Sequence, residues 1–376
     1  MIFKNKKKIA IFTTHPIQYQ VPLFKKLKNK GIIPHVYFAS KHGYKSKNQD
    51  NDFKKVFNWN IDLLGGYKFF FSNNQKKKIN SWFLDFNNLK NYLKKNKYDV
   101  VLIFGWSNIF YLKAFYLSYK YKLPIILRVE TNDEAKISKI KKIIKNKILY
   151  LLFKYVNYFL YIGKLNKAFY VGLKVETKKL FSAPYFVDNR FFSNQKLKSK
   201  KKTFTCLFVG KLIKRKNPQV FLNLALLMKD YRNIKFQIIG DGDLKQYCKN
   251  FVKEYRLNNL HIRGFKNQTE LKNCYKNADV LILPSKYETW GLVINEAMAS
   301  STAVITNKKC GASFDLIKNN KTGLIYDDEN IYDLKNKVLK ILLNKTLKKK
   351  IINNANKRIK LFTVNQTINS IVKILK

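Results

Sequence analysis

Two glutamates eight positions apart are the first residues of this chain whose spacing suits chemistry. Glu288 follows the breaker Pro284-Ser285, and Glu296 lies in the apolar run after Gly291. Because a helix turns by about 800° over eight residues, close to two full turns, both carboxylates can face the same side. One carboxylate can hold the vicinal hydroxyls of a ribose, and a second can hold a hexose. Two glutamates on a solvated helix face would show the same spacing.

A basic turn follows an apolar run earlier in the same half of the chain. Gly210 allows the backbone to turn tightly, Lys211 and Lys216 flank the turn, and Pro218 suits the first position of a helix. A helix N-terminus between two ammonium groups is a natural diphosphate site. A solvated turn in a lysine-rich chain is the alternative. Taken with the two glutamates, the turn predicts one site with cations for phosphates and carboxylates for sugars.

Polar residues also follow two apolar runs in the first half. His15 and Gln18 come after one run, and Arg128 and Glu130 come after another. Ligands of parallel sheets bind at the carboxyl ends of the strands. We therefore expect these four polar side chains near a ligand, although a loop histidine that caps a strand end is the alternative for His15. The other histidines are expected to be structural or exposed: His35, His42 and His261.

These residues need parallel strands and crossover helices to position them. Short apolar runs alternate with longer amphipathic stretches along the whole chain, which is typical of doubly wound α/β folds. The alternation restarts after the basic stretch 196–202. We predict two Rossmann-like domains with a ligand-binding cleft between them. Residues 1–187 would form the first domain, with a helix over 361–376 packing back on it, and residues 188–360 would form the second.

The expected elements follow the apolar runs. Strands are predicted over 8–13, 32–38, 100–104, 124–128, 158–162, 204–209, 235–239, 260–264, 280–283, 303–306 and 323–326. Helices are predicted over 21–29, 87–95, 109–121 and about 134–156, and from residues 218, 244, 270, 292, 313 and 330. The polar segment 40–78 stays unassigned.

The motifs together resemble the retaining glycosyltransferases of family 4, also called group 1, which have the GT-B fold. The E-x7-E element of that family matches Glu288 to Glu296, and its Gly-Arg-Leu…Lys turn matches Gly210 to Lys216, with Lys211 in place of the usual Arg. Further matches are Thr14-His15-Pro16-Ile17-Gln18-Tyr19, Gly240-Asp241-Gly242, Gly264-Phe265, Ala278-Asp279-Val280, Leu283-Pro284-Ser285 and Gly311…Gly323. The resemblance covers nearly all of the second half.

The resemblance implies transfer of a sugar from a nucleotide diphosphate sugar to a hydroxyl acceptor with retention, without a cofactor. By it, Lys211 and Lys216 would bind the donor diphosphate, Glu296 the ribose and Glu288 the transferred sugar. The implied donor-binding set also includes Gly210, Phe265, Gly291 and Leu292. His15, Gln18 and Arg128 would lie on the acceptor side, and Glu130 would join Glu288, Lys211 and Lys216 among the catalytic groups. The expected acceptor is a glycan or a lipid-linked glycan of surface polysaccharide synthesis. A nucleotide-sugar epimerase of the same fold is the alternative.

Neither metal nor disulfide chemistry is expected. Two Asp-x-Asp triplets could hold a metal on a diphosphate, Asp50-Asn51-Asp52 and Asp241-Gly242-Asp243. The second falls in the turn already matched to the family, and a displacement that relies on lysines needs no metal. The four cysteines form no CxxC pair, which fits a reducing compartment: Cys206, Cys248, Cys274 and Cys310.

The charge of the chain is the remaining feature to explain. Lys and Arg number 75 against 23 Asp and Glu, a net charge of +52, and only seven of the 75 are Arg. Nucleic-acid readers depend on Arg and on motifs that are missing here, so we expect no nucleic-acid partner. Compositional drift or a face toward anionic membrane lipid explains the lysines. With no run of 18 uncharged apolar residues and no signal cleavage site, we expect a cytoplasmic protein that is peripheral to the membrane.

Overall fold

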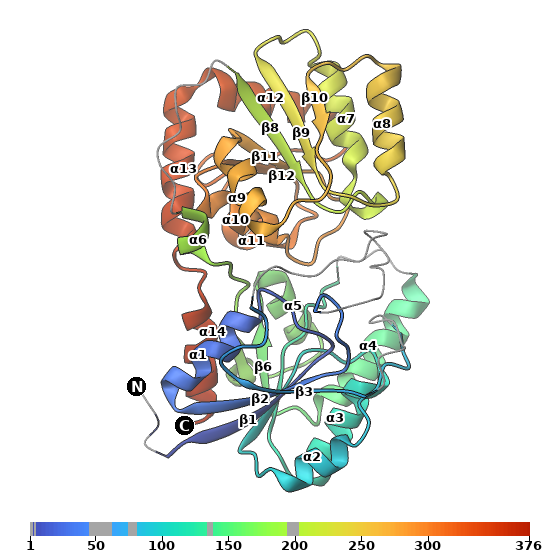
Figure 1. Ribbon diagram of the computed structural model, residues 1–376, viewed down its shortest axis with the longest axis vertical. Coiled ribbons are helices and arrows are strands. Elements are labelled where there is room, and N and C mark those ends of the chain that lie inside the picture. The colour runs from blue at the N-terminus through green and yellow to red at the C-terminus, as the bar shows by residue number, and fades with distance from the viewer. Residues whose placement is uncertain (1–2, 4, 45–61, 74–80, 134–137, 194–202) are drawn as a thin grey trace. The chain divides into compact units, whose positions relative to one another are not determined.

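Two compact units make up the protein. The computed structural model describes residues 3, 5–44, 62–73, 81–133, 138–193 and 203–376. Unit 1 holds the described residues up to Pro184 together with Val364–Lys376, and unit 2 holds those from Tyr185 to Thr363. Each unit is a parallel sheet flanked by helices (Figure 1). No helix in the described ranges is both long enough and apolar enough to cross a bilayer.

The described part of unit 1 contains a sheet with the strand order β3-β2-β1-β4-β5-β6-β7, and all neighbouring pairs are parallel. The strands are β1 Lys7–Thr13, β2 Ile32–Phe38, β3 Lys68–Phe71, β4 Val100–Ile103, β5 Ile125–Leu127, β6 Tyr158–Tyr161 and β7 Leu180–Ser182. From β1 the chain adds β2 and β3 toward one edge of the sheet, and then β4 to β7 toward the other edge. Such a reversal is a switch point, where the loops after the two central strands diverge and leave room for a ligand.

Helices cover both faces of this sheet, which is why the central strands read as continuous apolar runs. Figure 1 shows α1 and α14 on one side and α2, α3 and α4 on the other. The helices are α1 Val21–Leu27, α2 Leu89–Lys95, α3 Ile109–Lys120, α4 Lys139–Phe153, α5 Lys164–Gly172 and α14 Val364–Ile374, with 3₁₀ turns η1 Lys28–Lys30 and η2 Thr177–Lys179. Helix α14 is fastened to β7 because the Ser370 hydroxyl donates to the Ser182 carbonyl at 2.5 Å.

Unit 2 repeats the design with the order β10-β9-β8-β11-β12-β13 among its described residues. The strands are β8 Phe204–Val209, β9 Ile234–Ile239, β10 Leu260–Ile262, β11 Val280–Leu283, β12 Ala303–Thr306 and β13 Leu324–Ile325. The switch point lies between β8 and β11, which pair in parallel with Leu207 opposite Leu281. Both strands are fully or almost fully buried, so the loops that follow them start from a rigid base.

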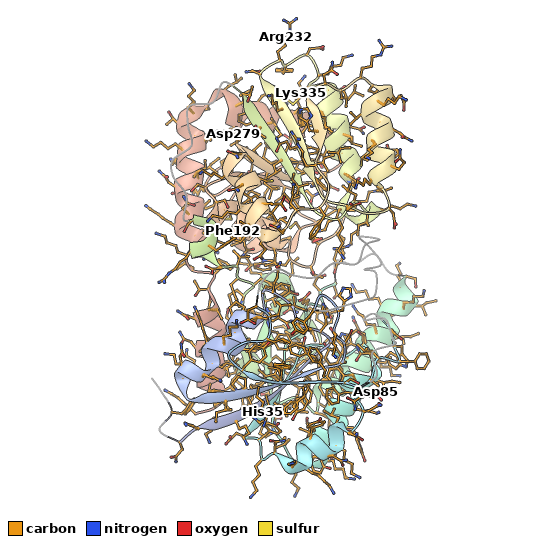
Figure 2. The ribbon with its side chains drawn as sticks, viewed as in Figure 1. His35, Asp85, Phe192, Arg232, Asp279 and Lys335 are labelled. Atoms are coloured by element: carbon orange, nitrogen blue, oxygen red, sulfur yellow. The ribbon has the colours of Figure 1, made fainter. Side chains whose placement is uncertain are left out.

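The helices of unit 2 pack around this sheet. They are α6 Asn189–Ser193, α7 Pro218–Leu227, α8 Lys245–Glu254, α9 Gln268–Asn277, α10 Leu292–Ala299, α11 Gly311–Leu316, α12 Ile331–Leu343 and α13 Lys345–Ile359, with the 3₁₀ turn η3 Lys214–Lys216. Asp279, labelled in Figure 2, fastens strand to helix. Its carboxylate accepts from the Thr205 backbone N–H at 2.9 Å and from Lys348 at 2.5 Å. The Ala278-Asp279-Val280 motif therefore has a structural role.

The predicted fold class is confirmed, and most predicted strands and helices are present within one to three residues of their predicted ends. Helix α4 begins at Lys139, after its N-cap Ser138, and not near residue 134. Strands β3 and β7 were missed: β3 lies in the unassigned segment, and β7 has only three residues. Helices α5, α6 and α13 were also missed. The triplet Asp50-Asn51-Asp52 and the stretch 196–202 lie outside the described residues.

Candidate functional site

The loops after β8 and β9 each begin with a glycine, Gly210 and Gly240. Gly210 has φ +158°, and its N–H donates to the Ile239 carbonyl at 3.0 Å. Gly240, after β9, has φ +157°, and a Cβ on it would lie 1.8 Å from the Gly210 carbonyl oxygen. The loops after these two neighbouring strands therefore touch through backbone alone, which keeps the turn low against the sheet.

The turn then places cations beside the start of a helix. Residues Lys214–Lys216 form η3, and Asn217 takes the left-handed conformation (φ 53°) that lets Pro218 open α7. Leu212 is fully buried and anchors the turn through its N–H, which donates to the Asp241 carbonyl at 2.8 Å. With Leu212 turned inward, Lys211 is half-buried and Arg215 is exposed.

Glu288 receives two of these cations. Its Oε1 lies 2.6 Å from Lys216 Nζ and 2.6 Å from Arg215 Nη1, although the Glu288 side chain is only 6% exposed. Arg215 Nη1 also donates to the Tyr287 carbonyl at 3.3 Å. Charge-assisted contacts of this kind satisfy a buried carboxylate that would otherwise be costly to desolvate. The loops after β8 and β11 are thus joined by an ion-paired cluster.

The backbone of the Glu288 loop is held independently of that side chain. The Glu288 N–H donates to the Lys309 carbonyl at 3.1 Å, and its carbonyl accepts from the Gly311 N–H at 3.0 Å. A Cβ on Gly311 would lie 2.1 Å from the Thr289 carbonyl oxygen, and Gly291 has φ +99°. Glycine is therefore required at both positions, where the loop passes close to the N-terminus of α11 and turns into α10.

Glu296 lies on α10, the helix that follows the Glu288 loop, and is buried. The Tyr275 hydroxyl of α9 donates to Glu296 Oε2 at 2.7 Å. Burial raises the pKa of Glu296 to about 7, and the Tyr275 hydrogen bond and the charge of Lys216 oppose that rise. Lys216 thus acts on both carboxylates of the E-x7-E element: it pairs directly with Glu288, and its charge stabilises the ionised form of Glu296.

The structure therefore brings together part of the predicted donor set. Gly210 lies beside the Lys216 side chain: a Cβ added to Gly210 would lie 3.6 Å from Lys216 Cδ. Gly291 lies against Glu288, with 3.8 Å from the position of its Cβ to Glu288 Cγ. The remaining donor-set residues are each half-buried in loops or at a helix start of unit 2: Lys211, Phe265 and Leu292.

The Gly240-Asp241-Gly242 turn is built around its aspartate. Asp241 is buried, and its carboxylate accepts from the Gly242 N–H at 3.0 Å and from Lys245 at 2.7 Å. These contacts hold the triplet as a compact loop after β9. Within the described ranges, no three His, Cys, Asp or Glu side chains gather where they could hold a metal ion. The four cysteines are free thiols.

In unit 1, two candidates follow β1. His15 Nδ1 shares a hydrogen bond of 2.9 Å with the Thr14 hydroxyl, and its ring packs edge-on against His42 at 5.3 Å. Gln18 lies three residues on, and within the described chain its Oε1 is a buried oxygen without a hydrogen-bond partner. Such an unsatisfied oxygen can accept a hydrogen bond from a hydroxyl group of a ligand.

The other two candidates follow β5. Arg128 is buried, donates to the Ala183 carbonyl at 3.5 Å and lies 5.5 Å from the centre of the Phe104 ring. Burial lowers its pKa, and the neighbouring Glu130 carboxylate opposes that change. Glu130 also accepts a hydrogen bond from Tyr19, whose pKa burial and this carboxylate raise. Tyr19 follows β1, so this contact joins the loops after β1 and β5.

His35 and His261 lie in strands and differ in how deeply they are buried. His35, labelled in Figure 2, is buried in β2 and shares a hydrogen bond of 2.8 Å with the Tyr98 hydroxyl. Burial lowers the pKa of His35 to about 4, so it is a neutral core residue, as predicted. His261 is half-buried in β10, and burial lowers its pKa too.

Three residues that complete these contacts were not predicted. Arg215 was passed over because it stands between two lysines in a basic run. Tyr275 is far from Glu296 in sequence, and only the packing of α9 on α10 brings them together. Tyr19 lies inside the quoted motif after β1, and its polar tip could have been recognised there. The signal in the sequence was a tyrosine among the polar residues of this loop, because the hydroxyl of a buried tyrosine needs a hydrogen-bond partner.

Comparison with known proteins finds glycosyltransferases. Residues 189–358 match the sequence model for the glycosyl transferases group 1. Over 303 residues, the chain is 29% identical to the GalNAc-alpha-(1->4)-GalNAc-alpha-(1->3)-diNAcBac-PP-undecaprenol alpha-1,4-N-acetyl-D-galactosaminyltransferase of Campylobacter jejuni, a match that covers 79% of this chain and 80% of that protein.

Solved structures agree on the architecture. A glycosyltransferase from Rickettsia africae superposes with a TM-score of 0.75 at 17% identity, over 99% of this chain and 98% of its own. The Anabaena protein Alr3699/HepE in complex with UDP gives a TM-score of 0.74 at 12% identity, over 98% and 99%. The family match of residues 189–358, the Campylobacter relative and these folds agree: the chain is a glycosyltransferase with the GT-B fold, and its second half matches the glycosyl transferases group 1.

Proposed function

We propose that the protein transfers a sugar from a nucleotide diphosphate sugar to a hydroxyl of a lipid-linked glycan, with retention at the anomeric carbon and without a metal. The observation that supports this most is the cluster in unit 2. There Lys216 pairs with Glu288 at 2.6 Å and acts electrostatically on Glu296. One ammonium group between two carboxylates, beside the start of α7, has the charges that a diphosphate and two sugars need.

The phosphate side of this proposal rests on the turn after β8. Lys211, Lys216 and the N-terminus of α7 would hold the donor diphosphate. Arg215 supports this assignment because its guanidinium already reaches the Glu288 carboxylate at 2.6 Å. It would supply the planar fork that the family's usual Arg provides and that Lys211 lacks. Gly210 would allow the phosphates to approach the backbone closely.

The sugar side rests on the two glutamates. Glu296 would accept the ribose hydroxyls, and Tyr275 would orient it through the 2.7 Å hydrogen bond. Glu288 would bind the transferred sugar, and Gly291 and Leu292 would line the donor site at the start of α10. Phe265, in the loop after β10, would contact the nucleobase. The Anabaena protein of the same fold, which is in complex with UDP, supports a nucleotide donor.

The chemistry would be mainly electrostatic. The leaving diphosphate gains negative charge as the glycosidic bond breaks, and Lys211, Lys216 and the helix N-terminus would stabilise that charge. The leaving phosphate oxygen would take the proton of the acceptor hydroxyl on the same face of the sugar, which gives retention. Because these cations neutralise the diphosphate, the step needs no metal.

The acceptor side would lie in unit 1. Gln18 Oε1 has no hydrogen-bond partner among the described residues and would accept a hydrogen bond from a hydroxyl of an acceptor sugar. His15 and Arg128 would flank it, and Glu130 would contact the reacting groups. The name of the Campylobacter relative, which acts on a glycan linked to undecaprenol diphosphate, supports a lipid-linked acceptor here. In this proposal residues 1–187 with 361–376 bind the acceptor, and residues 188–360 bind the donor.

A panel of nucleotide sugars tests the proposal. The true donor should raise the melting temperature, since a ligand at about 100 times its Kd adds about 2.7 kcal/mol to the free energy of unfolding. With that donor radiolabelled, the label should move to a lipid extract with its anomeric configuration unchanged. Recovery of an epimerised nucleotide sugar with no lipid product would support the epimerase instead. An inverted linkage would contradict retention.

A further inference from the structure

Helix α4 exposes an unusual amount of apolar surface. Of its fifteen residues, only Leu149 and Phe153 are buried. Five large aliphatic side chains of the helix are half exposed or more: Ile140 (71%), Ile143 (66%), Ile144 (53%), Ile148 (52%) and Leu151 (50%). We call these five residues the isoleucine face. Single exposed apolar residues are normal on a protein surface, but five on one helix call for a partner.

The five residues form one continuous stripe. At about 100° of rotation per residue, they lie within about 140° of the helix circumference. Leu149 and Phe153, which pack into unit 1, lie on the opposite side. The helix therefore has two apolar sides. The narrow side packs against unit 1, and the isoleucine face points to solvent.

Tyrosines extend this surface to the neighbouring helix. Tyr116 and Tyr119 are exposed on α3, and Tyr155 is exposed just after α4. The rings of Tyr119 and Tyr155 meet edge-on at 5.2 Å, which joins the end of α3 to the end of α4. Figure 1 shows both helices on the same side of the sheet. Tyrosine rings are favoured where an apolar phase meets water.

Lysines flank the isoleucine face. Helix α4 contains five lysines and no acidic residue: Lys139, Lys141, Lys142, Lys145 and Lys147. Asp133 lies 3.5 Å from Lys142 and 3.7 Å from Lys145. Lys139, Lys141 and Lys147 are exposed beside or within the stripe. Long lysine side chains can keep their charge in water while their stems lie along apolar surface.

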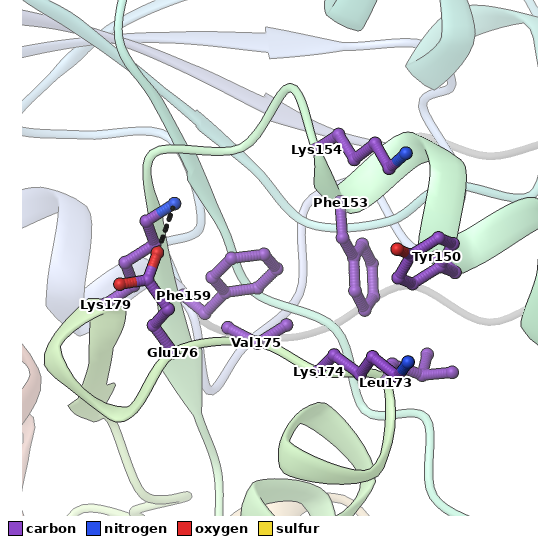
Figure 3. A pocket seen from close by; sticks show the side chains of 9 residues that line it. All are labelled: Tyr150, Phe153, Lys154, Phe159, Leu173, Lys174, Val175, Glu176 and Lys179. Atoms are coloured by element: carbon purple, nitrogen blue, oxygen red, sulfur yellow. Dashed lines mark ion pairs between the residues drawn. The ribbon is translucent and has the colours of Figure 1, made fainter.

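A basic hollow lies at the C-terminal end of α4, on the side of Phe153. It has a volume of about 180 Å³, and Phe153 and Phe159 form its apolar wall. Figure 3 shows the Phe153 ring between the side chains of Lys154 and Lys174. Lys179 is paired there with Glu176 at 3.3 Å. Lys154 and Lys174 therefore add positive charge beside this end of the helix.

We propose that the isoleucine face, with the tyrosines of α3 and the flanking lysines, is the surface on which this protein docks to an anionic lipid bilayer. An amphipathic helix with lysines beside a strong apolar stripe lies in the plane of a bilayer interface, and lysines add attraction to anionic headgroups. A second copy of the chain is a poor occupant because each copy carries a net charge of +52. Protein interfaces are also depleted in lysine at their centres, where Lys147 stands here.

The docking surface deepens the proposed function, and its link to a lipid-linked acceptor rests on that function. Binding to a bilayer places the enzyme where such an acceptor resides. The binding itself does not depend on the chemistry of unit 2. The two proposals can therefore fail separately, and the experiment keeps them apart.

Flotation with lipid vesicles tests the surface. The full chain should float with vesicles of phosphatidylglycerol mixed with phosphatidylcholine, less so at high salt, and not with phosphatidylcholine alone. Ile144→Glu/Ile148→Glu should weaken this binding by about tenfold or more, because it puts charge into the apolar stripe. The matched control is Tyr332→Glu/Leu343→Glu on α12 of unit 2, where both side chains are also exposed (63% and 78%). It should float like the wild type.

Transfer assays separate docking from catalysis. Ile144→Glu/Ile148→Glu should lose transfer to an acceptor in vesicles to the same degree as binding, and keep the wild-type rate on a detergent-solubilised acceptor. Lys216→Ala should float normally; if it kept full transfer, the proposed function would fail and the docking surface would stand. Unchanged flotation of the isoleucine variant, with wild-type circular dichroism, would overturn the docking proposal. So would a dimer in sedimentation velocity that this variant dissociates, since a second copy would then cover the face.

Discussion

Lys216 Nζ lies 2.6 Å from Glu288 Oε1, and this contact joins the loop after β8 to the loop after β11. The two strands are neighbours at the switch point of the unit 2 sheet. Residues that are distant in sequence therefore meet at the carboxyl edge of the sheet, where open α/β folds bind ligands. The chemistry proposed for this glycosyltransferase depends on that pair and on Glu296 behind it.

Glu288→Ala should abolish detectable transfer while the protein still folds. The loop backbone is held by hydrogen bonds to Lys309 and Gly311 that do not involve the side chain, so the loop stays in place while Arg215 and Lys216 lose their shared carboxylate. Loss of one preorganised polar contact to a reacting group costs about 100- to 1,000-fold in turnover. Turnover with the true donor and a thermal melt measure the two effects. Glu254→Ala, on the exposed side of α8, is the control, and equal loss in both variants would point to a general effect of charge.

Glu296→Gln should stabilise the protein at high pH while it weakens donor binding. Burial raises the pKa of Glu296 from 4.5 to about 7. Between these two values the folded protein keeps a proton that the unfolded chain releases, so the free energy of unfolding falls as pH rises, and it stays lower above about 7. The loss amounts to about 3 kcal/mol. Glutamine does not ionise, and its side-chain oxygen can still accept from Tyr275.

Melting curves over a range of pH measure this effect. The melting temperature of Glu296→Gln should exceed that of the wild type above pH about 7 and converge with it toward pH about 4.5. For the wild type, kcat/KM for the donor should rise as Glu296 ionises, with an apparent pKa near 7. Tyr275→Phe should move that transition to higher pH, because the hydroxyl stabilises the ionised form. A variant that follows the wild-type melting curve at every pH would show that Glu296 is not the titrating group.

Gly240→Ala should destabilise the fold and weaken donor binding together. The new Cβ would lie 1.8 Å from the Gly210 carbonyl oxygen, at a φ of +157° that other residues rarely adopt. The strain should cost about 1–3 kcal/mol, and the displaced Gly210 turn carries Lys216. Gly172→Ala is the matched control, since a Cβ there meets nothing within 4 Å and alanine in α5 should add about 0.5–1 kcal/mol. Chemical denaturation and donor titration compare the two, and equal stability would show that the loops do not need this close contact.

Local motifs allowed much of the unit 2 cluster to be predicted. Glu288, Glu296 and Lys216 belong to short patterns whose spacing survives without any tertiary information, and fully buried strands such as β8 and β11 read as apolar runs. The contact between Tyr275 and Glu296 depends on how α9 packs on α10, and helix packing leaves no fixed spacing in sequence. The short strand β7 carries too few residues for a period to be seen.

Helix α4 shows a second limit of sequence patterns. Its isoleucines repeat with a helical period, which predicts an amphipathic helix whose apolar stripe faces the core. In the structure the core side is the narrow stripe of Leu149 and Phe153, and the broader stripe faces solvent. Periodicity identifies the faces of a helix, but only packing decides which face is covered. The docking surface therefore emerges from burial and not from the pattern of residues.

The most direct test of the central claim is transfer of a labelled sugar by Lys216→Ala beside Lys214→Ala. Both lysines lie in η3, but Lys214 is exposed while Lys216 lies 2.6 Å from Glu288. Each variant removes one positive charge from the same short turn, so the comparison isolates position from charge. We expect a lipid-linked product with retained configuration from the wild type and Lys214→Ala, and none from Lys216→Ala. Equal turnover of Lys216→Ala and the wild type with the true donor would contradict this expectation.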